Sequence, residues 1–386
     1  MKTIFSGIWE YLKNTNKLFW LLTIAASCYG SLLIASVQRS IDYNYLKTQL
    51  VAVTLGYIGA IILSVMDYKT IAKMWYVVGG VALFLTVLVF FVGIQVEGTD
   101  DKAWLRLPGG FTFQPSELTK ICFIITFSYH LSYLVEKGKI KKFTSILGLI
   151  FHLAVPVVLI HLQGDDGAVL IFAFMALVMA FLAGVALRYF FALILLVGCA
   201  APIVWTYILN DDHRGRILAL FDLDGNASNR FLWQQYQGKI SIATGQLDGQ
   251  GLFNGPRVES QIVPYQENDF IFSVAGEELG FIGCLLLLAI LLLIMIKALI
   301  IASNTADALG KFICYGFFAL IMVQTCLNIG MVLGFLPVIG VTLPFFSAGG
   351  TSAMCLYLGV GLVQSVYMHR NDPDKLNYRS EYYPTL

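Results

Sequence analysis

Charged residues are scarce in this chain, and this scarcity argues against a soluble fold. Asp, Glu, Lys and Arg make up 13% of the 386 residues, whereas 58% of the residues are hydrophobic and the mean hydropathy is +0.75. A soluble domain averages roughly 25% charged residues. The formal net charge is only +1, so the sequence predicts no basic surface for a nucleic-acid partner.

Motifs for cofactors and metals are also missing. The sequence contains no P-loop, no GxGxxG loop, no zinc motif and no Ser-His-Asp order. Its seven cysteines all fall within apolar runs and lack metal-ligand spacing, which predicts buried free thiols rather than disulfides or zinc ligands. No small-residue cleavage site follows the first apolar run, so we expect no cleavable signal peptide.

Apolar runs of about 20 residues are abundant, and this is the length of a membrane-spanning helix. We expect an all-α, polytopic integral membrane protein in which residues 1–386 form a single transmembrane domain. The predicted spans number about ten and cover residues 17–37, 46–65, 72–94, 117–135, 143–162, 167–186, 188–209, 270–300, 311–335 and 343–367.

The distribution of Lys and Arg predicts the orientation of these spans. If both termini are cytoplasmic, fifteen of these residues lie inside and ten outside, and five of the ten belong to one long loop, 210–269. Long loops translocate regardless of their charge, so the bias favours cytoplasmic termini and an extracellular long loop. Loops of this length are usually functional. Within it, residues 231–244 are expected to form an amphipathic helix on the membrane surface.

The long loop ends at Asp269, directly before a long apolar segment, which places this carboxylate at the mouth of a span. Helix capping and the helix dipole explain an acidic residue at such a position, and the dipole is expected to lower its pKa. Glu277 and Glu278 lie about two turns further on, at a depth where acidic residues are usually functional or paired. From these residues alone, capping is the commoner role for Asp269.

A second group of polar residues precedes the fourth predicted span. Pro115 suits the first position of that helix, and Gln114 or Ser116 suits its cap. Glu117 and Lys120 are three residues apart, so they face the same side of the helix and can form an ion pair. Such a capped helix with a structural ion pair is one interpretation, and a functional polar site is the other.

Two further segments interrupt the apolar pattern. The turn at 163–167 contains the adjacent acids Asp165 and Asp166, which could cap a helix, bind a cation or serve a site. The segment 328–352 contains two prolines and several glycines at membrane depth, where irregular backbone requires a covering of protein or a cavity. It is interpreted either as a bent turn for close helix packing or as one wall of a lipid or sugar site.

Together, these motifs resemble the SEDS family (shape, elongation, division and sporulation), which includes RodA, FtsW and SpoVE. The resemblance covers about residues 17–370. It rests on three runs: Phe113-Gln114-Pro115-Ser116-Glu117; Asn268-Asp269-Phe270-Ile271-Phe272 with Gly276-Glu277-Glu278-Leu279-Gly280-Phe281; and Asn328-Ile329-Gly330 with Leu336-Pro337, Gly340, Leu343-Pro344-Phe345, Ser347 and Gly349-Gly350. The segment 237–255 and the short tails are more similar to RodA than to FtsW.

The chain also departs from the family pattern. The family commonly has Pro-Glu-x-His-Thr-Asp-Phe where this chain has Pro264-Tyr265-Gln266-Glu267-Asn268-Asp269-Phe270. The family turn Gln-Pro-Asp-Leu-Gly corresponds to Gln163-Gly164-Asp165-Asp166-Gly167, and Ser-Tyr-Gly-Gly corresponds to Ser347-Ala348-Gly349-Gly350. Supporting residues therefore differ, whereas the acids at 165 and 269 match.

The resemblance implies a peptidoglycan glycosyltransferase that polymerises lipid II at the outer face of the bacterial cytoplasmic membrane, for cell elongation and shape. It implies a multi-pass protein that associates with membrane lipids, a class B penicillin-binding protein and other proteins of elongation or division. No cofactor is certain, and a divalent metal cation is an open alternative for neutralising the leaving pyrophosphate.

In this reaction Asp269 is expected to be the catalytic base. The expected substrate-binding residues are Trp104, Arg106, Gln114, Glu117, Lys120, Asp165, Arg216, Glu277 and Ser347. Arg106, Lys120 and Arg216 are the candidate cations for the pyrophosphate.

Two other functions remain open from the sequence. A lipid II flippase or other lipid transporter would also explain acids and broken helices within the membrane, although it needs a polar path through the membrane. A non-catalytic scaffold of the cell-wall synthesis complex would tolerate the loss of Asp269.

Overall fold

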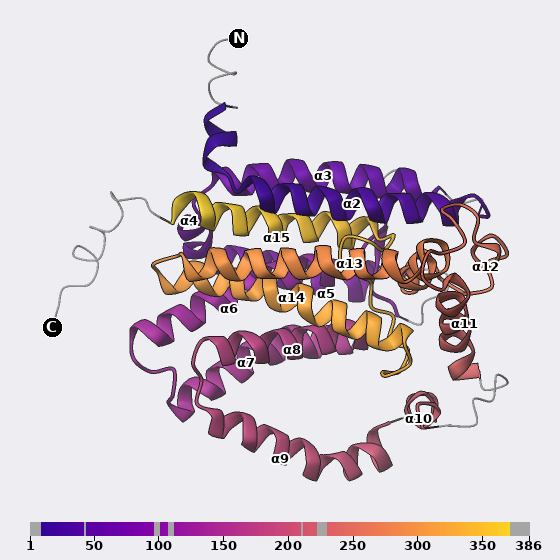
Figure 1. Cartoon of the computed structure of the whole chain (residues 1–386). Helices are drawn as coiled ribbons and strands as arrows, with labels where there is room; N and C mark the ends of the chain where they lie inside the picture. The colour runs from indigo at the N-terminus through magenta and orange to yellow at the C-terminus, as the bar shows by residue number, and fades with distance from the viewer. Residues whose placement is uncertain are drawn as a thin grey trace.

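The computed structural model describes residues 9–41, 44–95, 101–106, 112–209, 211–221 and 230–370. These residues form a bundle of long helices with smaller elements gathered at one end (Figure 1). Within the described residues, nine helices are long and apolar enough to cross a membrane, and α8 is a shorter apolar helix of 17 residues. The predicted polytopic all-α fold is confirmed.

The long apolar helices are α2 (Lys17–Gln38), α3 (Tyr45–Val65), α5 (Trp75–Val92), α6 (Pro115–Glu136), α7 (Phe143–His161), α8 (Asp166–Leu182), α9 (Leu187–Ile203), α13 (Ile271–Ser303), α14 (Ala308–Val332) and α15 (Gly350–His369). The shorter elements are α4 (Tyr68–Lys73), the π-helix η1 (Val204–Ile208), α10 (Asp211–Ala219), α11 (Arg230–Gly245), α12 (Pro256–Glu259) and the antiparallel strands β1 (Leu105–Arg106) and β2 (Thr112–Phe113).

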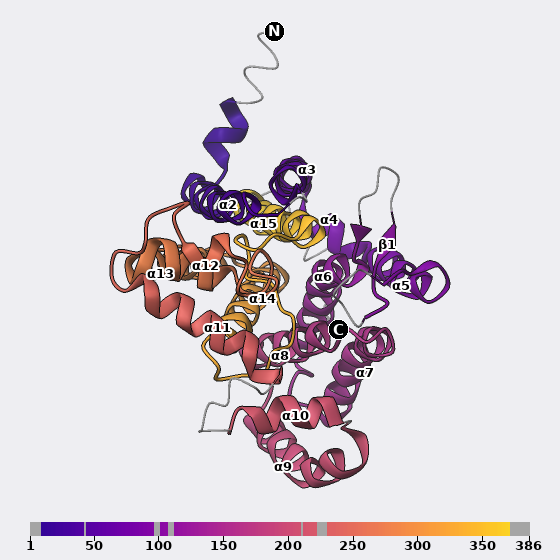
Figure 2. The same ribbon diagram turned by 90° about the vertical axis from the view of Figure 1, so that its right-hand side faces the viewer.

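Burial separates central helices from peripheral ones. In α6, α14 and α15, 72% of the most apolar 18-residue window is buried, whereas α9 with η1 buries none of its window. Figure 2 shows α9 at the edge of the bundle. An apolar helix that buries so little of its surface must face lipid along most of its length, so α9 is a lipid-facing helix and α6, α14 and α15 form the core.

The polar connections gather at one end of the bundle. The elements α10, α11 and α12 lie there, with α11 and α12 beside the start of α13, while the start of α2 and the end of α15 lie at the opposite end (Figure 1). The two ends of the described chain therefore lie on the same side. This arrangement agrees with the expected separation of a polar loop side from a terminal side.

The predicted last span, 343–367, began too early. Residues 333–349 form an irregular loop, and α15 begins only at Gly350. Pro337 and Pro344 each lack a backbone donor, which disfavours a helix across this segment. The structure therefore removes seven residues from the predicted span and assigns them to a loop at the polar end.

The predicted span 270–300 is also not one continuous helix. Gly280 has φ 65° and ψ −162°, a backbone conformation outside the helical region that glycine tolerates. The loop after α11 fills the break: the Phe281 amide donates to the Gln246 carbonyl at 2.8 Å, and the Gln250 amide donates to the Glu277 carbonyl at 2.9 Å. The freed backbone groups of α13 are thus satisfied by the loop.

The expected helix at 231–244 is present as α11, but it packs closely against α13. A Cβ atom built on Gly245 would lie 1.8 Å from the carbonyl oxygen of Gly276, and one built on Gly276 would lie 2.8 Å from the Ile242 side chain. Only glycine permits such an approach at these positions. The long loop is therefore anchored to a spanning helix through this contact.

Candidate functional site

Asp269 lies at the polar end of the bundle, in the turn that leads into α13. The N-cap of α13 is Phe270, and no side chain forms a capping hydrogen bond there. The expected role of Asp269 as a helix cap is therefore wrong. Its side chain is partly exposed, and none of the described residues donates a hydrogen bond to its carboxylate.

The backbone around Asp269 is held by the irregular loop 333–349 and by α14. The Asn328 side-chain amide donates to the carbonyl oxygens of Asp269 and Val341, both at 2.7 Å. The Ser347 hydroxyl donates to the Asn268 carbonyl at 2.6 Å and accepts from the Leu343 amide at 2.8 Å. These bonds fix the position of Asp269 without using its carboxylate.

Asn328→Ala removes both amide hydrogen bonds at once. We expect it to lower the rate of the polymerisation that the family resemblance implies by roughly 10- to 100-fold, because the Asp269 carbonyl loses its partner and the carboxylate loses its fixed position. Asn304→Ala is the matched control, since this exposed amide bonds only the Ile300 carbonyl of its own helix end. Equal rates for the two variants in a glycan-chain assay would contradict the positioning role.

Burial, together with the smaller effects of the nearby Glu267 and Asp101 charges, raises the pKa of Asp269 to about 7. The expectation that the helix dipole lowers this pKa is therefore wrong. The reason is that Asp269 does not cap α13, so its carboxylate loses water and faces other acids instead of a row of amide donors.

Asp165 organises a second cluster, formed by the start of α6 and the start of α8. Its Oδ2 accepts hydrogen bonds from the Gln114 amide at 2.9 Å and from the Ser116 hydroxyl at 3.0 Å. Its Oδ1 accepts from the Ala168 amide at 2.9 Å, so Asp165 is the N-cap of α8, as one interpretation of the turn predicted. Gln114 is the N-cap residue of α6, but its side chain bonds Asp165 instead of the helix.

Burial raises the pKa of Asp165 to about 6, against the opposing hydrogen bond from Ala168. The charge of Asp101 acts on both Asp165 and Asp269, so both carboxylates lie near this residue. Residues 339–340 lie between them: a Cβ built on Gly167 would lie 2.7 Å from the Ile339 carbonyl, and one built on Gly340 would lie 3.6 Å from Asp269 Oδ2.

The predicted ion pair between Glu117 and Lys120 is confirmed. Lys120 Nζ lies 2.8 Å from Glu117 Oε1, and the two side chains are 2% and 13% exposed. Both residues belong to α6, one turn beyond Gln114 and Ser116. At this burial each charge depends on the other for compensation, so the pair is a structural element of the start of α6.

The other expected substrate-binding residues occupy different positions. Trp104 is half-buried and pairs its backbone with Ile94, and its indole Nε1 is buried without a hydrogen-bond partner in the described structure. Arg106 is exposed on β1, and residues 107–111, which follow it, lie outside the described residues. Arg216 on α10 donates to the Val338 carbonyl at 3.0 Å, which ties α10 to the loop 333–349.

The side chains of Glu277 and Ser347 both form hydrogen bonds with backbone groups of the protein. Glu277 is fully buried, and its Oε1 accepts from the backbone amides of Arg257 at 2.7 Å and Val258 at 3.2 Å. It therefore fastens α12 to α13. Ser347 is 5% exposed and positions Asn268, as described above. Substrate contacts for these two residues remain predictions, and we omit them from the site proposed below.

Three residues near Asp269 were not among the expected site residues. Asn328 is a buried amide within a largely apolar helix, and Glu267 is an acid that departs from the family pattern. Both signals are visible in the sequence. Asp101 has no such signal, because its link to Asp165 and Asp269 depends on chain segments that meet only in the folded protein.

These features define a polytopic membrane protein with a polar, acidic site at one end of its helix bundle. The chain belongs to the FtsW/RodA/SpoVE family, described as cell cycle proteins, whose model matches residues 16–372. It is 31% identical over 354 residues to a probable peptidoglycan glycosyltransferase FtsW of Geobacter sulfurreducens, covering 90% of this chain and 93% of the relative. It is 30% identical over 353 residues to the peptidoglycan glycosyltransferase MrdB of Escherichia coli, covering 91% and 92%.

Solved structures show the same fold. A chain from a peptidoglycan synthase complex, described as coordinating polymerization and crosslinking, matches with a TM-score of 0.77 and 26% identity, covering 93% of this chain and 99% of that one. The rod shape determining protein RodA of Thermus thermophilus matches with a TM-score of 0.68 and 26% identity, covering 93% and 98%. Both the FtsW and the RodA branches are thus represented among the relatives.

Proposed function

We propose that this protein polymerises lipid II into glycan strands and that Asp269 is the catalytic base. The activity is that of a peptidoglycan glycosyltransferase, the name carried by the curated relatives. One observation carries the role of Asp269. Its partly exposed carboxylate accepts no hydrogen bond from the described residues, while the backbone that bears it is clamped by Asn328.

The pKa of Asp269 suits this role. General bases work best when their pKa lies near the operating pH, and burial together with the neighbouring acids raises this pKa to about 7. Asp269 would accept the proton of the acceptor sugar hydroxyl as the hydroxyl oxygen bonds to the anomeric carbon of the donor. The bond from that carbon to the pyrophosphate oxygen breaks, and polyprenyl pyrophosphate leaves.

The leaving pyrophosphate needs positive charge. Of the three expected cations, Lys120 is already paired with Glu117 at 2.8 Å. Arg106 is exposed on β1, and Arg216 is half-buried on α10. We therefore assign the pyrophosphate to these two arginines, with Glu117, Lys120 and Asp165 forming the wall of the site.

A divalent cation is the alternative means of neutralising the leaving pyrophosphate, and the described side chains do not favour it. Within the described ranges, no group of three or more His, Cys, Asp or Glu side chains could hold a metal ion. A hard cation such as Mg²⁺ would then depend on the substrate phosphates for most of its ligands. Arg106 and Arg216 carry this part of the proposal in its place.

The proposed pKa predicts the pH dependence of polymerisation. Asp269 must be ionised to accept a proton, so activity should rise with pH and reach half of its plateau near pH 7. An Asp with the ordinary pKa of 3.8 would give a flat profile over the same range. The rate at limiting lipid II, measured from about pH 5 to pH 9, tests this expectation. A flat profile would contradict the raised pKa.

We place the protein in the bacterial cytoplasmic membrane, with both termini in the cytoplasm and the site at the outer face. Both ends of the described chain lie on the same side of the bundle, which supports this orientation. The excess of Lys and Arg in the expected inner loops supports it as well. The proposed partner is a class B penicillin-binding protein, supported by the structural match to a chain of a peptidoglycan synthase complex. We propose a role in elongation and shape, supported by the match to RodA.

The test combines the purified protein, its transpeptidase partner and lipid II, with glycan chains resolved on a gel. Polymer formation by the wild-type protein is the expected result. If labelled lipid II crosses the liposome membrane and no glycan polymer forms, the proposal is overturned in favour of a transporter. If the protein forms no polymer and moves no lipid II, a scaffold remains as its function.

A further inference from the structure

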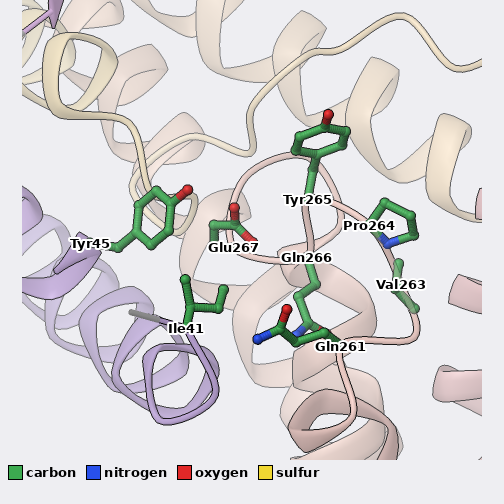
Figure 3. Close-up of a pocket in the computed structure, with 8 residues that line it drawn as sticks. All are labelled: Ile41, Tyr45, Gln261, Val263, Pro264, Tyr265, Gln266 and Glu267. Atoms are coloured by element: carbon green, nitrogen blue, oxygen red, sulfur yellow. The ribbon is translucent and has the colours of Figure 1, made fainter. Parts of the chain in front are cut away.

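A pocket with a volume of about 340 Å³ lies at the last part of the long loop, in the segment that leads to Asp269 (Figure 3). Ile41 and Tyr45 contribute one side of it, and residues of the segment 261–267 contribute the other. The Gln261 side chain also donates a hydrogen bond to the Ser40 carbonyl, which ties the two sides together. The pocket is thus a defined feature of the polar end.

Glu267 is the unusual residue of this pocket. It is 5% exposed, yet no described residue donates a hydrogen bond to its carboxylate or forms an ion pair with it. Figure 3 shows its side chain among the lining residues, with Tyr45 on one side and Tyr265 on the other. A buried carboxylate without a donor is costly, and such a group is normally satisfied by a partner. The missing donors therefore have to come from water or from a ligand in the pocket.

The segment that carries Glu267 is strained at two positions, and both residues line the pocket. Gln261 and Tyr265 have φ of 50° and 53°, in the left-handed region that non-glycine residues seldom adopt. Strained backbone of this kind persists at functional sites when the surroundings hold it in place. The Glu267 carbonyl is itself held, since it accepts from the Ala348 amide at 2.8 Å.

The lining suits a sugar ring better than other small molecules. A carboxylate accepts hydrogen bonds from the hydroxyl groups of a sugar, and the rings of Tyr45 and Tyr265 offer apolar faces for its C–H groups. The volume lies near the lower end of the 300–1,000 Å³ range of ligand pockets, which fits one or two rings rather than a lipid tail.

We propose that this pocket is a saccharide subsite in which Glu267 accepts hydrogen bonds from hydroxyls of a sugar ring adjacent to the reacting one. The subsite rests on the proposed glycosyltransferase function and adds a specificity residue to it. Glu267 stands where the family pattern has His, so the subsite is a property of this chain and of relatives that share the replacement. It binds the lipid-linked disaccharide or the growing glycan through its sugar part.

Glu267→Gln tests the subsite, and Glu259→Gln is the matched control, because Glu259 is an exposed acid in the same loop outside the pocket. Loss of the charge also lowers the pKa of Asp269, so rates are compared at about pH 8.5, where Asp269 is ionised in both variants. We expect Glu267→Gln to raise KM for lipid II about tenfold, with kcat changed by less than about twofold. An unchanged KM, or a loss of kcat alone, would overturn the subsite.

A second measurement separates this proposal from the proposed function. The lipid-free disaccharide of N-acetylglucosamine and N-acetylmuramic acid serves as the probe, and its binding to the full-length protein is followed by saturation-transfer NMR. We expect binding to the wild-type and Glu259→Gln proteins and about tenfold weaker binding to Glu267→Gln. Equal binding to all three would refute the subsite even if polymerisation is normal. Weakened binding in a protein that makes no polymer would keep the subsite and refute the polymerase.

Ile41→Trp provides an independent variant if Glu267→Gln fails to fold. Ile41 is half-buried on the opposite side of the pocket, and the larger side chain narrows the space without changing any charge. We expect the same rise in KM and the same loss of disaccharide binding. Normal KM and normal binding in this variant would show that the pocket does not hold the sugar.

Discussion

Asp269→Asn is expected to lower the rate of lipid II polymerisation by about 10²- to 10⁴-fold, the usual contribution of a general base. The amide has nearly the same shape as the carboxylate but cannot accept a proton from a sugar hydroxyl. The backbone bonds from Asn328 and Ser347 remain, because they reach the carbonyls of residues 269 and 268. Since Asp269 caps no helix, the fold should keep its stability.

Gel-resolved glycan chains, made with the partner protein present, measure this effect. The control is Asp248→Asn, which removes an exposed carboxylate elsewhere in the long loop. It should polymerise at the wild-type rate. Undiminished polymer from Asp269→Asn would remove Asp269 from catalysis, and unaltered complex formation by that variant would then favour the scaffold interpretation.

Glu117→Ala is expected to destabilise the folded protein by about 3–5 kcal/mol, the cost of leaving one partner of a buried ion pair uncompensated. The reason lies with Lys120, whose side chain is only 2% exposed and lies 2.8 Å from Glu117. Its charge would have to remain buried without a partner or be lost by deprotonation. The polymerisation rate should fall as well, because this pair lies one helical turn from the residues that bond Asp165.

A double variant separates stability from function. Glu117→Leu combined with Lys120→Met replaces both charges by apolar groups of similar volume, and stability should return close to the wild-type value. Thermal unfolding in detergent measures the stability of the single and double variants. If the single variant is as stable as the wild type, the ion pair does not stabilise this part of the fold. If the double variant regains stability but not activity, the charges themselves serve the site.

Several features of the fold were predictable because they depend on local pattern. The apolar runs identify ten helices, since a segment of about 20 apolar residues has few alternatives to spanning a bilayer. Pro115 marks the start of α6, and the spacing of Glu117 and Lys120 predicts their ion pair. The acidic turn at 163–167 predicts the N-cap of α8 by Asp165. In each case the interacting groups lie within one or two helical turns of each other.

Other features were predicted wrongly or not at all from the sequence, because they depend on contacts between segments far apart in the chain. The break at Gly280 is stabilised by the loop at 246–251, which lies about 30 residues earlier. The late start of α15 depends on how residues 333–349 bond to residues 267–269. A helical pattern cannot reveal these contacts, since it records only which face of a single segment is apolar.

The sequence by itself determines that this is a polytopic all-α membrane protein of the FtsW/RodA/SpoVE family with Asp269 at the end of its long loop. The expected pKa of this residue was wrong in direction, because the start of a helix suggests a capped, stabilised carboxylate. Folding instead places Asp269 away from the amides of α13 and near Glu267 and Asp101, where lost hydration and like charges raise its pKa to about 7. Desolvation and charge proximity are properties of surroundings built from distant segments, so only the folded chain establishes how Asp269 can act as a base.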